Sequence, residues 1–163
     1  MVSALGPTTG FNIVIPVYNG SGSDISAGDP VSHDIAASAM HTYRSATSDA
    51  SVVGTASDEI AVPGKKTAAA DDATFLGIAL KDIKNGEIGP VVVYGVVEAQ
   101  VYGTTGAGGQ VTKGDKLSTK ADGTLDDGGT ANFIAIALED GDTATAKKLV
   151  FVNSLTVAGF GGA

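Results

Sequence analysis

Short apolar runs alternate with turn-forming residues along the whole chain. Because the runs are rich in Val and Ile and recur at a spacing of roughly 8–20 residues, they predict β-strands and not helices. Only Ile35–Met40 and Thr67–Ala73 could form a helical turn or two. The pattern therefore predicts an all-β fold, a small barrel or sandwich. The predicted strands lie at Phe11–Tyr18, Val31, Val52–Val53, Ile60–Val62, Phe75–Leu80, Val91–Tyr102, Val111, Asp115–Thr119, Phe133–Leu138 and Leu149–Asn153.

Three local signals refine this prediction. Pro16 lies inside the first run and has no backbone N–H to donate, so that strand is expected at an edge or paired on one side only. Asn85-Gly86 lies between apolar runs and predicts a type I′ turn, in which both central residues have positive φ. Gly95 interrupts the longest run and predicts a bulge or a bend.

Glycine-rich stretches mark the loops and the C-terminal end of the chain. Residues 1–10 lack apolar periodicity and are expected to form a flexible arm, whereas residues 156–163 form a glycine-rich tail. A single β domain is therefore expected over residues 11–155. The predicted loops are Asn19–Asp24, Gly103–Gly109 and Asp122–Thr130.

Two pairs of segments resemble one another. Ile25–Ser32 matches Val111–Ser118 at an apolar first residue, a central Gly-Asp, an apolar residue two positions later and a final Ser. Phe75–Asp82 matches Phe133–Asp140 at Phe, Ile, Ala, Leu and Asp. Because the two separations differ, the matches indicate a duplicated unit with unequal insertions and not a solenoid. The alternative is that similar turns arose independently.

The composition permits a folded domain and excludes several kinds of site. The chain has 163 residues, of which 43% are hydrophobic and 23 are glycine, and this fits one domain with a core. It contains no cysteine, so disulfides, thiol catalysis and cysteine-based metal sites are excluded. No run approaches the about 18 apolar residues of a membrane span, and the first residues lack the pattern of a secretory signal. No membrane partner is expected.

The charge balance argues against nucleic acid as a partner. Lys and Arg number 10 against 18 Asp and Glu, which gives a formal net charge of −8. A nucleic-acid binder needs a basic surface to displace counterions from phosphates. Lys65-Lys66, the only tight basic pair before the C-terminal region, is too small for that purpose.

No motif for catalysis or phosphate binding is complete. Gly109–Gly114 approaches the P-loop pattern, but Asp115 replaces the lysine and would repel a phosphate. Gly103–Gly109 has the glycines of a dinucleotide-binding loop in the wrong register. Gly20–Asp24 lacks the last glycine of a nucleophile elbow. All three segments are interpreted as loops.

The histidines are the best candidates for a metal ligand or a general base. His33 and His41 lie near Asp29 and Asp34. Their spacing does not place them on one face of a helix, so a solvated or turn-capping role is expected. We expect no catalytic residue, no metal site and no cofactor.

Two acidic pairs, Asp71-Asp72 and Asp126-Asp127, lie in predicted turns. Paired carboxylates can bind calcium when they follow the spacing of a calcium-binding loop. Neither pair matches the Asp-x-Asp-x-Asp-Gly pattern of such a loop, so neither is predicted to be a calcium site.

Several short motifs, glycine-containing or apolar, follow one another in a defined order. They are Gly28–Val31, Phe75–Leu80, Gly95–Ala99, Gly114–Leu117, Ile136–Glu139 and Leu149–Val152. This order resembles that of tailed-phage capsid decoration proteins, also called cement or head-stabilising proteins. The resemblance extends over about residues 25–153. It implies a small β-barrel or β-tulip-like domain that is commonly trimeric.

The same resemblance implies a function. The implied function is that of a structural protein of the virion. Such a protein lies on the outer surface of an icosahedral phage capsid, binds the major capsid protein and bridges neighbouring capsid subunits. A homotrimer, with the chain as its own partner, is implied in the same way. The family pattern carries no catalytic residues, so an enzyme is not expected.

The first predicted strand is the expected capsid contact. Its apolar side chains would form an extended edge behind the flexible arm, which suits the addition of a strand to a capsid sheet. The alternative is that this segment is simply the first strand of the protein's own barrel. The residues predicted to make the contact are Phe11, Ile13, Ile15, Val17 and Tyr18.

Two other classes of function remain open from the sequence. One is a non-catalytic glycan- or small-ligand-binding β domain displayed on a surface. The chain has no Trp and only 6% aromatic residues, which weakens this reading because sugars stack on flat aromatic faces. The other is an unusual enzyme subunit that uses His33 or His41.

Overall fold

The computed structural model describes residues 11–36, 61–103 and 110–154, and these residues form nine strands without an α-helix. No helix in this part of the chain is long and apolar enough to cross a membrane. The prediction of an all-β fold is confirmed. The strands are β1 (Ile13–Asn19), β2 (Pro30–His33), β3 (Val62–Lys66), β4 (Phe75–Ala79), β5 (Ile88–Val101), β6 (Lys116–Thr119), β7 (Leu125–Asp126), β8 (Ala135–Ala137) and β9 (Ala146–Asn153).

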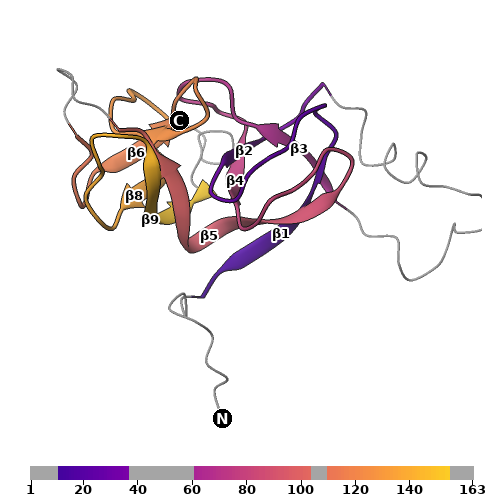
Figure 1. Cartoon of the computed structure of the whole chain (residues 1–163), viewed down its shortest axis with the longest axis horizontal. Helices are drawn as coiled ribbons and strands as arrows, with labels where there is room; N and C mark the ends of the chain where they lie inside the picture. Colours follow the sequence, from indigo (N-terminus) through magenta and orange to yellow (C-terminus); the bar gives the residue numbers. More distant parts are fainter. Residues whose placement is uncertain (1–10, 37–60, 104–109, 155–163) are drawn as a thin grey trace, which may run out of the picture.

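One sheet contains all nine strands, in the order β1-β3-β2-β4-β5-β7-β6-β8-β9. Two further pairings, β1 with β5 and β5 with β9, close this sheet on itself twice. The first closed ring, here called the first barrel, consists of β1, β3, β2, β4 and β5. The second barrel consists of β5, β7, β6, β8 and β9. The two barrels lie side by side, and β5 runs from one to the other (Figure 1).

Strand β5 belongs to both barrels because it is 14 residues long and changes partners near its middle. Its first half pairs with β1 and β4, and its second half pairs with β9 and β7. The change of partner occurs at Tyr94, which faces Ile13 of β1 and Asn153 of β9. Gly95 follows with a φ of 126°, so the bend predicted at this glycine is present. A side chain at Gly95 would collide with the side chain of Asn12.

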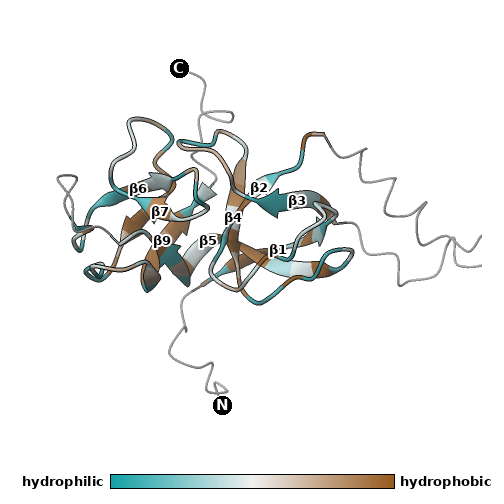
Figure 2. Cartoon of the chain, turned by 45° about the horizontal axis from the view of Figure 1, so that its top comes forward, coloured by the Kyte–Doolittle hydropathy of each residue, from teal (hydrophilic) through white to brown (hydrophobic). Residues whose placement is uncertain are grey.

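Each barrel has its own buried core, and hydrophobic segments accordingly occur in both halves of the molecule (Figure 2). The core of the second barrel also includes side chains from β4 and the first half of β5, and these join the two barrels. The core of the first barrel consists of Val17, Ile25, Val31, Ala79, Ile83 and Val91. The larger cluster contains Phe75, Ile78, Val92, Val97, Ala99, Val101, Val111, Leu117, Leu125, Ile134, Ala135, Ala137, Val150 and Val152.

The two barrels are built from equivalent strands. In each, a first strand (β1, or the second half of β5) pairs in parallel with a third strand, β3 or β7. The same first strand pairs antiparallel with the last strand of its barrel, which is the first half of β5 or β9. The second strand, β2 or β6, lies between the third and the fourth strand, and the fourth strand is β4 or β8. One topology therefore occurs twice.

The hydrogen bonds of the two predicted repeats confirm this equivalence. The N–H of Gly28 donates to the carbonyl of Ala79 at 2.8 Å, and the N–H of Gly114 donates to the carbonyl of Ala137 at 2.8 Å. The two glycines have φ values of 89° and 99°. The next residue in each case is an aspartate that accepts a bond from a backbone N–H three residues before it. The similar segments are therefore two copies of one structural unit.

Carboxylates at the far ends of the repeats are equivalent as well. Asp82 accepts a hydrogen bond from the N–H of Ala27 at 2.8 Å, and Asp140 accepts one from the N–H of Lys113 at 2.8 Å. Each aspartate thus ties the turn that precedes the second strand of its barrel to the loop that follows the fourth strand. Because the two aspartates have the same role, both repeats end in Asp.

Some local predictions are confirmed and others are wrong. Pro16 pairs only with β5, because the pairing of β1 with β3 begins at Val17, as a residue without an N–H requires. The turn at Asn85-Gly86 is not of type I′, since only Gly86 has positive φ. Thr67–Ala73 forms turns and no helix. The predicted arm of residues 1–10, the tail of residues 156–163, the Val52–Val53 strand and most of Ile35–Met40 lie outside the described residues.

Gly95 provides a test of the shared strand. We expect Gly95→Ala to lower the free energy of unfolding by about 3 kcal/mol or more, because the added Cβ combines positive φ with a collision against Asn12. Gly86→Ala is the matched control, since Gly86 also has positive φ but has no atom near the added Cβ. That control should lose about 1–2 kcal/mol. Urea denaturation measures both, and equal losses would contradict the assigned role of Gly95.

Candidate functional site

The residues predicted to contact the capsid differ widely in exposure. Phe11 is 80% exposed and Ile13 is 38% exposed, whereas Val17 is completely buried in the core of the first barrel. Ile15 and Tyr18 are half-buried, and Ile15 packs against that core. Phe11 and Ile13 are therefore available to a partner, but Val17 is not. The prediction of Val17 as a contact residue is wrong, because alternate residues of a closed barrel point inward.

Val14 is an exposed residue that the sequence analysis missed. It is 42% exposed, and it points away from the core because successive side chains of a strand lie on opposite faces. The predicted contact residues did not include Val14. Phe11, Ile13 and Val14 together form the exposed apolar start of the chain's described part, here called the N-terminal surface.

The backbone of β1 is paired on both sides only over its second half. Val17–Asn19 pairs with β3 on one side, and the whole strand pairs with β5 on the other. Residues 13–16 therefore have no strand partner on the β3 side within the described part of the chain. Unpaired backbone groups of this kind can accept a strand from another protein. The predicted strand addition is thus restricted to residues 13–16, and β1 as a whole is the first strand of its own barrel.

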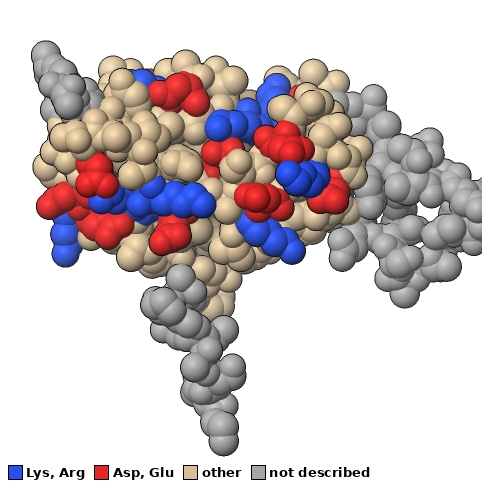
Figure 3. All heavy atoms as spheres, in the orientation of Figure 1, with Lys and Arg blue, Asp and Glu red and all other residues tan. Residues whose placement is uncertain are grey.

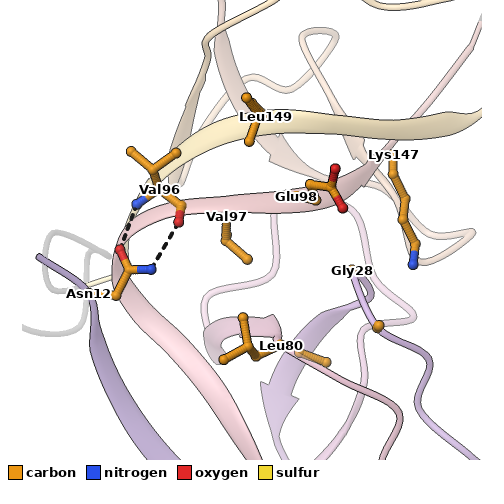
Figure 4. A pocket seen from close by; sticks show the side chains of 10 residues that line it. Asn12, Gly28, Leu80, Val96, Val97, Glu98, Lys147 and Leu149 are labelled. Carbon is orange, nitrogen blue, oxygen red and sulfur yellow. Dashed lines mark hydrogen bonds between the residues drawn. The ribbon is translucent and has the colours of Figure 1, made fainter. Parts of the chain in front are cut away.

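Asn12 fixes the start of this strand to the second barrel. Its side-chain carbonyl accepts a hydrogen bond from the N–H of Val96 at 2.9 Å, and its side-chain amide donates to the carbonyl of Val96 at 3.0 Å (Figure 4). The amide group thus imitates a neighbouring strand. The N-terminal surface is therefore held by the junction between the two barrels.

A cavity of about 230 Å³ lies at this junction and receives side chains from both barrels (Figure 4). Leu80 comes from the first barrel, and Val97 and Leu149 come from the second. Glu98 and Lys147 are its charged residues, and no histidine, serine or aromatic residue lines it. The cavity therefore offers neither a nucleophile with a base nor a flat ring on which a sugar could stack.

The residues around His33 have structural roles. His33 lies in β2, where it pairs with Gly64 of β3, and it is half-buried. The buried Asp29 accepts a hydrogen bond from the N–H of Ser26 and forms an ion pair with Lys66 at 3.1 Å. No group of three potential metal ligands occurs among the residues described. His41, the other candidate, lies outside them.

Asp72 connects the two barrels through hydrogen bonds. Its carboxylate accepts bonds from the hydroxyl of Ser32 in β2 and from the N–H and hydroxyl of Thr74, each at 2.7 Å. Its own N–H donates to the hydroxyl of Thr119 in β6 at 2.7 Å. Partial burial raises the pKa of Asp72, but the bonds from Ser32 and Thr74 together outweigh burial, and the pKa lies below its ordinary value. Asp72 is therefore a structural carboxylate.

Asp126 and Asp127 form a different kind of pair. Burial raises the pKa of Asp127, and the neighbouring Asp126 raises it further. Asp126 accepts a hydrogen bond from the amine of Lys120 at 3.3 Å. The pair lies at the end of β7, where Asp126 has a local partner in Lys120.

The charged residues are dispersed. On the face shown in Figure 3, acidic and basic side chains lie next to one another, and a short row of basic side chains is flanked by acidic ones. Several are paired, for example Lys84 with Asp24 at 2.8 Å and Lys148 with Asp142 at 3.0 Å. The described residues thus present an exposed apolar strand start on a double barrel.

Comparison with protein families shows to which family the chain belongs. The model of the phage cement protein family matches residues 58–153. The chain belongs to the phage cement protein family. It is therefore a structural protein of a phage virion that associates with the capsid. The resemblance to capsid decoration proteins noted in the sequence is confirmed.

A solved structure shares the fold. The head fiber gp8.5 N base of bacteriophage phi29 superposes with a TM-score of 0.50 at 15% sequence identity, over 88% of this chain and 96% of that chain. At this identity the likeness concerns the fold alone. Comparison with curated protein sequences gave no match.

Asp72 provides a test of the carboxylate that holds the turn before β4 against β2. We expect Asp72→Asn to lower the free energy of unfolding by about 2 kcal/mol at pH 7, because the bonds from Ser32 and Thr74 lose their charged acceptor, whereas the bond from the backbone N–H to Thr119 remains. A lowered pKa stabilises the fold above the ordinary carboxyl value near 3.8, and this contribution disappears as the pH falls through the lowered value. The difference between the variant and the unmodified protein should therefore shrink below about pH 4.

Asp142→Asn is the matched control for this experiment. Its carboxylate is 57% exposed and pairs with Lys148 at the surface, where an ion pair contributes about 0–1 kcal/mol. Thermal unfolding at pH 7 and at pH 3 measures both variants. A loss for Asp72→Asn that is the same at both pH values would show that the charge of Asp72 does not stabilise the fold.

Proposed function

We propose that this cement protein binds the outer surface of an icosahedral phage capsid and stabilises the shell by bridging neighbouring copies of the major capsid protein. We also propose that it acts as a homotrimer. The observation that supports the capsid contact is the N-terminal surface: Phe11, Ile13 and Val14 are exposed, and no described strand pairs with residues 13–16 on the β3 side. A member of a cement family needs such a contact and no catalytic site.

The contact would act by removing apolar side chains and unpaired backbone groups from water. Full burial of one large apolar side chain contributes about 1.5–3 kcal/mol. Because Phe11, Ile13 and Val14 are already ordered by β1 and by the bonds of Asn12, less conformational entropy is lost on binding. Ile15 would contribute its backbone edge, whereas Val17 and Tyr18 hold the strand in the barrel.

Binding to the assembled shell stabilises it by linkage. A protein that binds the closed shell but not its separated subunits adds its binding free energy to the stability of the shell. Repetition of the contact over an icosahedral surface, and connection of three copies in a trimer, would increase this effect through avidity. A modest contact per copy is therefore sufficient.

Phe11 provides the direct test. We expect Phe11→Asp to weaken binding to capsids by about tenfold or more, because an exposed apolar anchor is replaced by a charge that would have to be desolvated. Ile35→Asp is the matched control, since Ile35 is 70% exposed and lies in the chain after β2, outside the N-terminal surface. Co-sedimentation with purified capsids measures both variants, and equal binding would exclude Phe11 from the contact.

The segment before Phe11 is tested separately. If residues 1–10 contribute to the contact, a chain that begins at Phe11 should co-sediment with capsids less than the full chain does. The circular dichroism spectrum and the melting temperature should stay unchanged, because the described core begins after these residues. Undiminished binding would restrict the contact to the N-terminal surface itself.

A further inference from the structure

An apolar groove of about 280 Å³ lies on the outer face of the second barrel, on β8 and β9. Phe133 is 40% exposed and Ile136 is 42% exposed, and the half-buried Phe151, which pairs with Ile136, also lines the groove. Lys116 lies at the rim, with its amine 5.9 Å from the centre of the Phe133 ring. Nothing in the described part of the chain covers this groove.

The internal repeat identifies the equivalent residues of the first barrel. Ile136 pairs with Phe151 across β8 and β9, and Ile78 occupies the same position in β4, where it pairs with Val92 of β5. Phe133 corresponds to Phe75 in the similar segments. The equivalents Phe75, Ile78 and Val92 are 4%, 0% and 0% exposed. The outer face formed by these equivalent residues is therefore buried in the first barrel and exposed in the second.

The first barrel's face is buried because the second barrel packs against it. Phe75, Ile78 and Val92 belong to the same buried cluster as Val97 and Ile134 of the second barrel, and β4 contacts β9 directly. Val97 and Ile134 lie at one end of the second barrel's interior and are 3% and 1% exposed. The end of one barrel thus receives the outer face of the other.

The matching end of the first barrel is unfilled. Ile15 is equivalent to Val97, since Ile15 pairs with Val91 and Val97 pairs with Val150, at the same place in each barrel. Leu76 is equivalent to Ile134 by the repeat. Ile15 and Leu76 are only partly buried, although their equivalents are completely buried. The molecule therefore carries both halves of its own barrel–barrel interface a second time, and no described residue covers either of them.

We propose that the groove of Phe133, Ile136 and Phe151 binds a second copy of this chain, through the end of that copy's first barrel at Ile15 and Leu76. The groove is continuous with the existing interface, because Ile134 and Ala135 line it and also belong to the cluster that joins the barrels. Such a contact joins two different surfaces, so it generates a closed ring or an open chain of copies.

A ring of three copies is the closed form that the proposed homotrimer requires, and the inference deepens that part of the proposed function. It does not involve the exposed side chains of Phe11 or Val14, although Ile15 lies within residues 13–16, whose backbone edge is proposed to contact the capsid. Self-association is tested at Ile136 and Leu76, and co-sedimentation with capsids is tested at Phe11, so the two experiments change different residues. A failure of one can be told from a failure of the other.

The first experiment is sedimentation equilibrium of the full chain. We expect the unmodified protein and Ile35→Asp to be trimeric. We expect Ile136→Asp to be monomeric at concentrations up to about 100 μM, because the dissociation constant of the contact rises by several factors of ten. Ile136 is exposed on one side, so the circular dichroism spectrum of the variant should stay unchanged. A folded Ile136→Asp protein that is still trimeric would overturn the assignment of the groove while the trimer stands.

The second experiment uses the absence of cysteine in the chain. Ile136→Cys and Leu76→Cys are prepared as separate proteins, mixed, and treated with a short bifunctional maleimide. We expect a cross-linked pair that contains one copy of each variant, because the contact joins the groove of one copy to the barrel end of the other. Efficient cross-linking of Ile136→Cys with itself would indicate a symmetric contact and overturn the proposal, as would a monomeric unmodified protein at every concentration.

Discussion

Strand β5 is the constraint on which the rest of the structure depends. Its first half closes the first barrel and its second half opens the second, so neither barrel is complete without it. A strand can serve two barrels only if it turns between them, and Gly95, with a φ of 126°, permits that turn. Around this point the side chain of Asn12 bonds to Val96 and completes the edge that the turn leaves open. The junction therefore fixes the relative position of the barrels and of the N-terminal surface.

This arrangement is consistent with the structural role of the family. The family is one of cement proteins, and what a cement protein needs is surface held at a defined place. Repetition of one unit supplies two such surfaces. They are the groove at Phe133 and Ile136 on the second barrel and the end of the first barrel at Ile15 and Leu76, which are equivalent to the two surfaces that join the barrels inside the chain. The start of β1 supplies another, since only half of that strand is paired on both sides. Contacts to the capsid and contacts between copies can therefore coexist.

The features of the fold that depend on neighbouring residues in the sequence were predictable. The apolar runs located β1, β4, β5, β8 and β9, and Pro16 and Gly95 indicated one-sided pairing and a bend, all of which the structure contains. The turn type at Asn85-Gly86 was wrong, because the loop that contains it is tied to other segments, with Asn85 bonded to Asp24 and Gly86 to Asn19. The capsid contact stays a prediction, and the structure adds only the exposure of its residues: Phe11 and Ile13 are exposed, as is Val14, whereas Val17 is in a core.

The sequence by itself determined that the chain is all-β, that it lacks the residues of a thiol or cysteine-metal site, and that it contains a repeat. These properties depend on residue type and on short-range order. Only the tertiary structure decided that the repeat builds two barrels with a common strand, and that Phe75 and Ile78 are buried while Phe133 and Ile136 are exposed. Equivalent residues have the same sequence pattern in both repeats. Whether a neighbour covers them depends on where the other barrel lies, and no local pattern contains that information.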